Sequence, residues 1–128
     1  MSMEAAVIIS LDSKPLHWHL PAGRSSVYLP DTRDMWDLIW ENREDLLGIA
    51  HSHPGAGIPS PSMEDLTTFR DVESALGRRL LWWICSEDEL IQLKWCGPDP
   101  LEYKKRHLIE RPQGEPASWL RTLREVSY

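Results

Sequence analysis

The sequence predicts an α/β (α+β) domain in which a mostly antiparallel β-sheet is flanked by helices. Two pairs of β-prone runs are each separated by a short polar turn, which is typical of β-hairpins. Between and after these pairs lie stretches whose apolar residues recur at helical spacing. The chain has 128 residues, of which 41% are hydrophobic. We therefore expect one domain that covers residues 1–128 and has a core of its own.

The first hairpin is predicted close to the N-terminus. Residues 5–11 are β-prone and largely apolar, and residues 16–20 form a second extended run. The Asp-Ser-Lys-Pro sequence at residues 12–15 suits the turn between them. A further short extended piece is expected at residues 27–29, after a Pro-Ala-Gly loop.

A helix and a buried strand follow this region. Asp31 or Thr32 can cap a helix that runs to about residue 44. The helix is expected to present one apolar face, formed by Met35, Trp36, Ile39 and Trp40. Residues 46–50 are apolar enough for a buried strand, and that strand leads directly into a pair of histidines.

The second helix is predicted from its start and stop residues. Residues 55–61 are rich in Gly and Pro and form a loop, and Ser62 follows as a strong N-cap. Gly77 is placed to end the helix. Between these two residues, one helix face carries the apolar side chains Leu66, Phe69, Val72 and Leu76.

The C-terminal part is predicted to contain a second hairpin and a third helix. Residues 80–85 and 90–95 are strand-like and flank a polar turn, so we expect them to pair. Pro-rich breaks follow at residues 98–100 and 112–116. The last helix is expected to present four apolar side chains to the core, namely Trp119, Leu120, Leu123 and Val126.

Charge and composition restrict the possible partners and the compartment. The formal net charge is −6 and the pI about 5.3, so the basic surface typical of nucleic-acid binding is missing. The longest apolar run, residues 80–85, has the length of a strand and is too short to span a membrane. No signal sequence is recognised, and Cys85 and Cys96 do not make a disulfide framework. We therefore expect a cytoplasmic protein that binds neither nucleic acid nor membranes.

Two histidines and an aspartate suggest a metal site. His51 and His53 lie at positions i and i+2 of an extended segment, so their side chains point to the same side. Asp65, in the first turn of the helix that begins after Ser62, can supply a third ligand. Two His and one carboxylate leave a fourth position open, which is the arrangement of catalytic zinc. We predict one Zn²⁺ per chain.

The same residues resemble the motif of the JAMM (MPN-plus, Prok-JAB) metallopeptidases. His51-Ser52-His53-Pro54, followed by Pro61-Ser62-Met63-Glu64-Asp65, matches an HxH pair, a proline and then Ser-x-x-Asp. Residues 54–64 contain one residue more than the usual spacer, and the excess falls among residues 55–60. The resemblance covers about residues 4–97 and implies a compact bacterial member with a curled, mixed, mostly antiparallel sheet flanked by helices.

The resemblance also implies two catalytic residues. Relatives have a glutamate on an early strand that acts as general base, and Glu4 is the best candidate here. Glu41 and Glu44 are the alternatives, although they lie on a predicted helix. Ser62 would donate a hydrogen bond to the oxyanion that develops during catalysis. Ser62 and Asp65 also have the spacing of a capping box, a role that can coexist with catalysis.

By this resemblance the protein is a zinc-dependent peptidase or isopeptidase that cuts at the C-terminus of a ubiquitin-like or sulfur-carrier protein. Its partners would be that substrate or its conjugates, with E1-like or E2-like proteins of the same operon. Two alternatives stay open, a phage-tail or other peptide hydrolase and a non-catalytic MPN-type scaffold. A second HxH pair, His17 and His19, has no acid nearby in sequence. For this pair we favour a structural or surface role over a place in the wall of a substrate groove.

Overall fold

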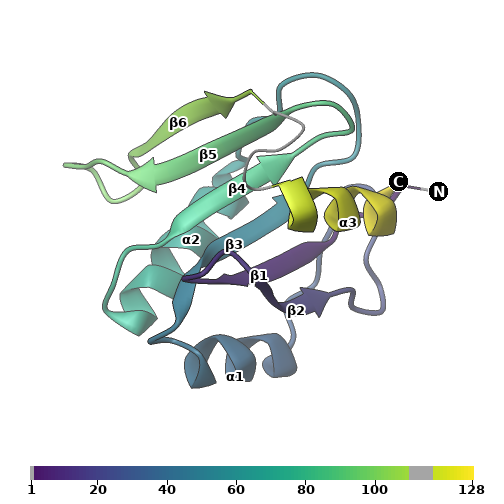
Figure 1. Ribbon diagram of the computed structural model, residues 1–128. Helices are drawn as coiled ribbons and strands as arrows, with labels where there is room; N and C mark the ends of the chain where they lie inside the picture. The colour runs from purple at the N-terminus through teal and green to yellow at the C-terminus, as the bar shows by residue number, and fades with distance from the viewer. Residues whose placement is uncertain (1, 110–116) are drawn as a thin grey trace.

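The computed structural model describes residues 2–109 and 117–128. In these residues, six strands form one sheet in the order β2-β1-β3-β4-β5-β6, shown in Figure 1. The elements in chain order are β1 (Ala6–Ser10), β2 (Pro15–His19), α1 (Arg33–Glu41), β3 (Leu46–Ser52), α2 (Met63–Leu76), β4 (Leu81–Cys85), β5 (Leu90–Trp95), β6 (Tyr103–Leu108) and α3 (Ala117–Ser127). No helix among the described residues is long and apolar enough to cross a membrane.

The sheet is mixed and mostly antiparallel, as predicted. β3 and β4 form the parallel pair, and the other four neighbouring pairs are antiparallel. Parallel neighbours need a crossover connection, which α2 provides between β3 and β4. The two parallel strands approach closely at Gly48, where an added Cβ would lie 1.8 Å from the Leu81 carbonyl oxygen. Glycine is therefore required at this position.

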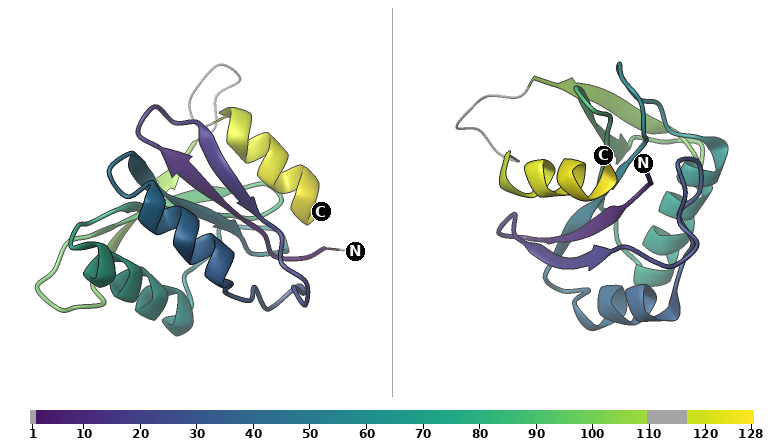
Figure 2. Two further views of the ribbon diagram at one scale, coloured as in Figure 1. Left: turned by 90° about the horizontal axis from the view of Figure 1, so that it is seen from below. Right: turned by 90° about the vertical axis from the view of Figure 1, so that its right-hand side faces the viewer.

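Two separate layers of side chains cover the two faces of the sheet. α1 and α2 lie on one side of it and α3 on the other (Figure 2). On the side of α1 and α2, the buried apolar residues include Ile8, Ile49, Phe69 and Trp82. On the α3 side they include Val7, Ala50, Trp83, Trp119 and Leu123. Adjacent strand residues alternate between the two layers, as the opposite placement of Trp82 and Trp83 illustrates.

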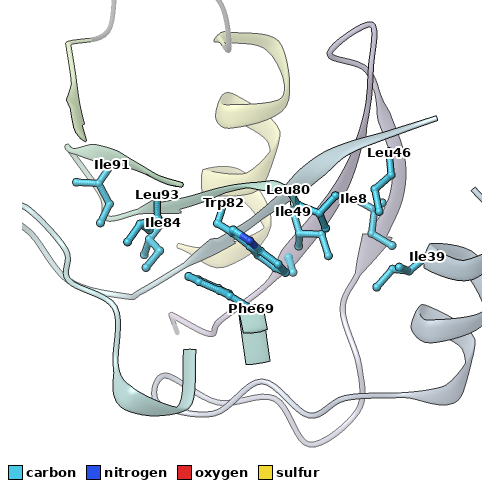
Figure 3. Close-up of a cluster of buried hydrophobic side chains, with 11 residues drawn as sticks. Ile8, Ile39, Leu46, Ile49, Phe69, Leu80, Trp82, Ile84, Ile91 and Leu93 are labelled. Atoms are coloured by element: carbon cyan, nitrogen blue, oxygen red, sulfur yellow. The ribbon is translucent and has the colours of Figure 1, made fainter. Parts of the chain in front are cut away.

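Helix α2 is fixed across β4 by aromatic packing and one buried carboxylate. The rings of Phe69 and Trp82 stack with their centroids 4.2 Å apart, and Figure 3 shows the two rings side by side. Glu73, which is 3% exposed, accepts hydrogen bonds from the Trp82 indole N–H at 3.0 Å and the Leu80 backbone N–H at 2.8 Å. These contacts hold α2, and with it the start of that helix, at a set position relative to the sheet.

The helix boundaries agree with the sequence for α2 and differ for α1. Ser62 caps α2 and Gly77 ends it in a left-handed conformation, both as predicted. Thr32 caps α1, but this helix ends at Glu41 and not near residue 44. The Asn42 side chain donates to the Leu38 carbonyl at 2.8 Å. Asn42 thus satisfies a carbonyl of the last turn and ends the helix early.

The sequence analysis missed one strand, β6. The extended piece expected at residues 27–29 is not part of the sheet. β6 reads Tyr-Lys-Lys-Arg-His-Leu, and its middle residues are exposed. Because it is an edge strand held by pairing with β5, its sequence lacks the apolar alternation used to recognise strands. The Pro-rich break predicted at residues 112–116 lies outside the described residues.

Candidate metal centre

The connection between β3 and α2 brings the predicted metal ligands together. His51 and Ser52 are the last residues of β3, and His53 follows directly. Since β4 runs parallel to β3, the connecting helix must start near the C-terminal end of β3 and run back along the sheet. Asp65, in the first turn of α2, therefore lies beside the two histidines.

The distances within this group are short. The Nε2 atoms of His51 and His53 are 3.0 Å apart. The Asp65 carboxylate faces both rings, with Oδ1 3.3 Å from His51 Nε2 and Oδ2 3.0 Å from His53 Nε2. The loop between His53 and Asp65 is one residue longer than usual, yet Asp65 still lies beside both histidines. Gly55 and Gly57, which adopt positive φ angles, accommodate the extra residue.

Glu4 reaches the same site from β1. Ala6 pairs with His51 in the antiparallel ladder between β1 and β3. Extending this register by two residues puts Glu4 opposite His53, on the same face of the sheet. The side chains meet, with Glu4 Oε1 3.9 Å from His53 Nε2. Glu4 is 8% exposed.

The alternative glutamates lie elsewhere. Glu41 is the last residue of α1 and Glu44 lies in the turn that follows, and both are exposed. Neither is among the residues that line the cavity beside the histidines. Of the three glutamates considered from the sequence, Glu4 is the one that the structure brings to His51 and His53.

The electrostatics of the site favour a positive charge between the carboxylates. Burial lowers the pKa of His53, but the hydrogen bond and charge of Asp65 and the charge of Glu4 outweigh it, so the pKa is raised. Burial acts to raise the pKa of Asp65, yet hydrogen bonds from His51 and His53 hold it well below its ordinary range. Burial raises the pKa of Glu4, with both histidines acting in the opposite direction. The negative charges of Asp65 and Glu4 would likewise attract a metal cation bound at the histidines.

Ser62 stands at the edge of the group. Its Oγ accepts from the Asp65 backbone N–H at 3.0 Å, and Asp65 Oδ2 accepts from the Ser62 N–H at 2.8 Å. This is the capping box predicted from the sequence. The box fixes the Asp65 side chain toward the histidines. Because Ser62 Oγ acts as an acceptor here, its own proton can still be donated to a ligand in the cavity.

The group opens into a cavity of about 620 Å³. Glu4, His51, His53, Ser62 and Asp65 all line it. Its lining comes from the first three turns of α2, from residues 26–32 and from α1. The apolar side chains along it are Ala6, Val27, Tyr28, Leu29, Met35, Trp36, Ile39, Ile49, Pro54, Phe69, Val72 and Trp82. The cavity is large enough for a short stretch of polypeptide beside the histidines.

The donor atoms fit a tetrahedral zinc ion. Ligands that lie about 2.0–2.2 Å from such an ion are about 3.3–3.6 Å from one another. The separations of 3.0–3.3 Å among His51, His53 and Asp65 are close to this value. Glu4, His51 and His53 also form a group whose ligand atoms all lie within 4.8 Å. The distance of 3.9 Å from Glu4 to His53 departs from 3.3–3.6 Å about as much as the 3.0 Å separations do, so both carboxylates lie within reach of an ion held by the histidines.

Comparison with known proteins agrees with this geometry. Residues 4–95 match the family Prok-JAB, described as prokaryotic homologs of the JAB domain. The chain belongs to the Prok-JAB family. The match begins at Glu4 and includes His51, His53 and Asp65. A search of curated proteins finds no match.

The JAB domain family includes metallopeptidases, and this member contains a group of residues that could hold a metal ion. In this member, a Glu, two His and an Asp converge at the C-terminal end of β3. The matched segment ends with β5, so β6 and α3 lie outside it.

Two of the other three histidines make structural contacts. His19 is buried, and its Nε2–H donates to the Pro30 carbonyl at 2.6 Å. It also lines the cavity, whereas His17 does not. His107 contacts the Glu89 carboxylate at 2.6 Å on the surface. No metal-binding group among the described residues includes these three histidines.

The wall formed by residues 26–32 and α1 was not predicted as part of the site. The available signal was weak: Val27 and Tyr28 are large apolar residues in a stretch between β2 and α1, and both are exposed. An exposed apolar pair beside a cavity is a feature of a binding surface. A sequence pattern alone could not reveal that this stretch faces α2.

Proposed function

We propose that this Prok-JAB protein is a zinc-dependent peptidase or isopeptidase that cleaves at the C-terminus of a ubiquitin-like or sulfur-carrier protein. The observation that carries the proposal is the convergence of His51, His53 and Asp65 next to a buried glutamate, in a cavity. Three ligands with an open position are typical of catalytic zinc sites.

In this proposal His51, His53 and Asp65 hold one zinc ion per chain. When bound, zinc would lower the pKa of a bound water and polarise the scissile carbonyl. Glu4 acts as general base and then returns the proton to the leaving amine. Its position beside His53 and its burial within the site support this role, because a general base must lie within reach of the proton that it accepts.

Ser62 is the proposed oxyanion donor. Its side chain lies at the N-terminus of α2, where the helix dipole also favours negative charge. The capping hydrogen bond from the Asp65 N–H restrains the Ser62 hydroxyl without using its proton. A restrained donor can stabilise a developing charge without reorganisation during the reaction.

The substrate would enter as an extended chain with small residues next to the cut. Glu4 and His51 are each 8% exposed, so a substrate backbone must approach closely to reach them. Glycines immediately before the scissile bond would let the backbone approach closely. The C-terminal Gly-Gly of ubiquitin-like proteins has this property, and E1-like or E2-like proteins would be the associated partners.

The compartment we propose is the cytoplasm. No disulfide joins Cys85, which is buried, and Cys96, which is exposed. Thiols of this kind are typical of a reducing environment.

A cleavage assay on fusion proteins tests the proposed function. Ubiquitin-like proteins fused to a reporter would be presented as a panel that differs only in the last two residues before the junction. The zinc-loaded enzyme should cut Gly-Gly fusions and cut bulky variants much more slowly, and a chelator should stop cleavage. Equal cleavage of all variants would contradict the proposed substrate. Absence of cleavage throughout the panel would contradict the proposed reaction.

A further inference from the structure

The residue between the two histidines faces the opposite side of the sheet. Because side chains alternate along a strand, Ser52 points away from His51 and His53 and toward α3. Ser52 is fully buried at 0% exposure, and Ser127, near the end of α3, is 1% exposed. Their hydroxyl oxygens are 2.8 Å apart. The hydrogen bond between Ser52 and Ser127 therefore joins the end of β3 to α3, on the face of the sheet that α3 covers in Figure 2.

This contact is part of a continuous chain of hydrogen bonds. The Ala5 backbone N–H donates to Ser52 Oγ at 3.0 Å. Ser127 Oγ lies 2.6 Å from the Leu123 carbonyl oxygen, which can only accept. The Ser127 hydroxyl lies within donating distance of both Ser52 Oγ and the Leu123 carbonyl, and the Ser52 hydroxyl also lies 3.5 Å from the Ala5 carbonyl oxygen. Consecutive hydrogen bonds thus join Ala5, Ser52, Ser127 and Leu123.

The end of α3 contacts the site at further points. The Met3 N–H, one residue before Glu4, donates to the Ser127 carbonyl at 2.9 Å. The Tyr128 hydroxyl donates to the His53 carbonyl at 3.1 Å. Ser127 and Tyr128 thus contact both segments that supply side chains to the site. The segment that carries Glu4 is contacted at Met3, and the end of β3 is contacted at Ser52 and His53.

We propose that Ser127 is a positioning residue for the metal centre. Through Ser52 it fixes the end of β3 that carries His51 and His53, and through Met3 it fixes the segment that carries Glu4. The inference rests on the proposed function, because it takes these side chains as ligands and base. α3 lies outside residues 4–95, so this support comes from outside the matched part of the chain.

A set of four variants tests this role. Ser127→Ala removes the hydroxyl, and Val126→Ala is the matched control, since it trims a partly buried side chain next to Ser127 on the same helix. Ser52→Ala and the double variant Ser52→Ala/Ser127→Ala complete a cycle. The substrate-independent measurement is zinc affinity, from competition with a chromophoric chelator.

Residues that orient metal ligands typically contribute about 10- to 100-fold to metal affinity or activity. We expect Ser127→Ala to bind zinc about tenfold more weakly than Val126→Ala does. The double variant should bind zinc no more weakly than Ser52→Ala alone, because Ser127 acts through Ser52. At saturating zinc, kcat of Ser127→Ala on a Gly-Gly fusion should fall about tenfold while KM stays within about twofold.

The proposal is overturned if Ser127→Ala and Val126→Ala bind zinc equally well, or if the losses of the two serine variants multiply in the double variant. Either result would leave Ser127 as an ordinary buried helix residue. If the wild type cleaves no fusion, the proposed function fails, but the zinc affinities of the four proteins still decide the positioning role.

Discussion

The two faces of the sheet at the end of β3 are built by alternate residues of one strand, yet they differ in chemistry. On the α1 and α2 side, His51 meets Asp65, Glu4 and a cavity of about 620 Å³. On the α3 side, Ala50 and Ser52 meet closely packed apolar and hydroxyl groups, including Leu123 and Ser127. The first face holds charges beside open space, and the second is closed.

The face on the α1 and α2 side can therefore bind a substrate and react with it, and the face on the α3 side can hold the reacting side chains in position. Charged groups in a cavity oppose compact packing, because each must be desolvated or paired. The closed face has no such conflict, so it can supply stability and rigidity. Substitutions on the open face should then change turnover with little loss of stability. Truncation of an apolar side chain in the α3 layer should mainly lower stability, whereas loss of the Ser127 hydroxyl, which contacts Ser52, should also weaken zinc binding.

The largest effect on the open face is expected for Glu4→Gln. The amide keeps the shape of the carboxylate and leaves His51, His53 and Asp65 in place, but it cannot accept the proton. Turnover should fall by about 10²- to 10⁴-fold, while zinc content and melting temperature stay near those of the wild type. Glu41→Gln, on an exposed residue of α1, is the control and should keep full activity. A Glu4→Gln enzyme with near wild-type kcat would exclude Glu4 as the base.

The matching substitution on the closed face is Leu123→Ala. Leu123 is fully buried in the α3 layer, at 0% exposure. Its truncation should lower the free energy of unfolding by about 2–5 kcal/mol, measured by urea denaturation. Well below its unfolding transition, the variant should still bind one zinc per chain. Loss of zinc in the folded variant would show that the two faces are not separable in this way.

A smaller effect on turnover is expected at Ser62. Ser62→Ala should reduce kcat by about 10²-fold, the loss seen when one oxyanion donor is removed. It should also cost about 1 kcal/mol of stability, because the N-cap of α2 is lost. Ser62→Thr keeps a hydroxyl for both roles and is the control. If Ala and Thr variants turn over equally fast, Ser62 acts as a cap alone.

The smallest effect concerns the pH dependence of stability at His19, on the wall of the cavity. Burial lowers the pKa of His19 below its ordinary value of 6.5, although the Pro30 carbonyl acts in the opposite direction. The folded state therefore favours neutral His19, and this contribution is complete above pH 6.5. It is lost as the pH falls from 6.5 through the folded-state pKa.

His19→Gln provides the comparison, because its amide can still donate to the Pro30 carbonyl. Melting temperatures from pH 7.5 to 5 should fall more steeply for the wild type than for this variant. Parallel curves would mean that the protonation of His19 does not affect folding.

The elements that the sequence predicted well have strong local signals. Ser62 and Asp65 form a capping box that predicts the start of α2, and Gly77 predicts its end. The position of Asp65 beside His51 follows once β3, α2 and β4 form a parallel crossover unit. Glu4 was proposed from family resemblance, and its position opposite His53 follows from the antiparallel register.

The elements that the sequence missed depend on distant partners. β6 is highly charged and is a strand because it pairs with β5. The contact between Ser52 and Ser127 joins residues 75 positions apart. No local period or motif encodes such a contact, since it depends on how α3 docks against the sheet.

Elemental analysis of zinc tests the central claim most directly. We predict about one zinc per chain in the wild type, and loss of zinc in His53→Ala, which removes one of the three ligands. His17→Ala is the matched control, because His17 belongs to the second HxH pair and does not line the cavity. It should retain the wild-type zinc content. Full zinc in His53→Ala, or loss of zinc in His17→Ala, would contradict a metal centre at the end of β3.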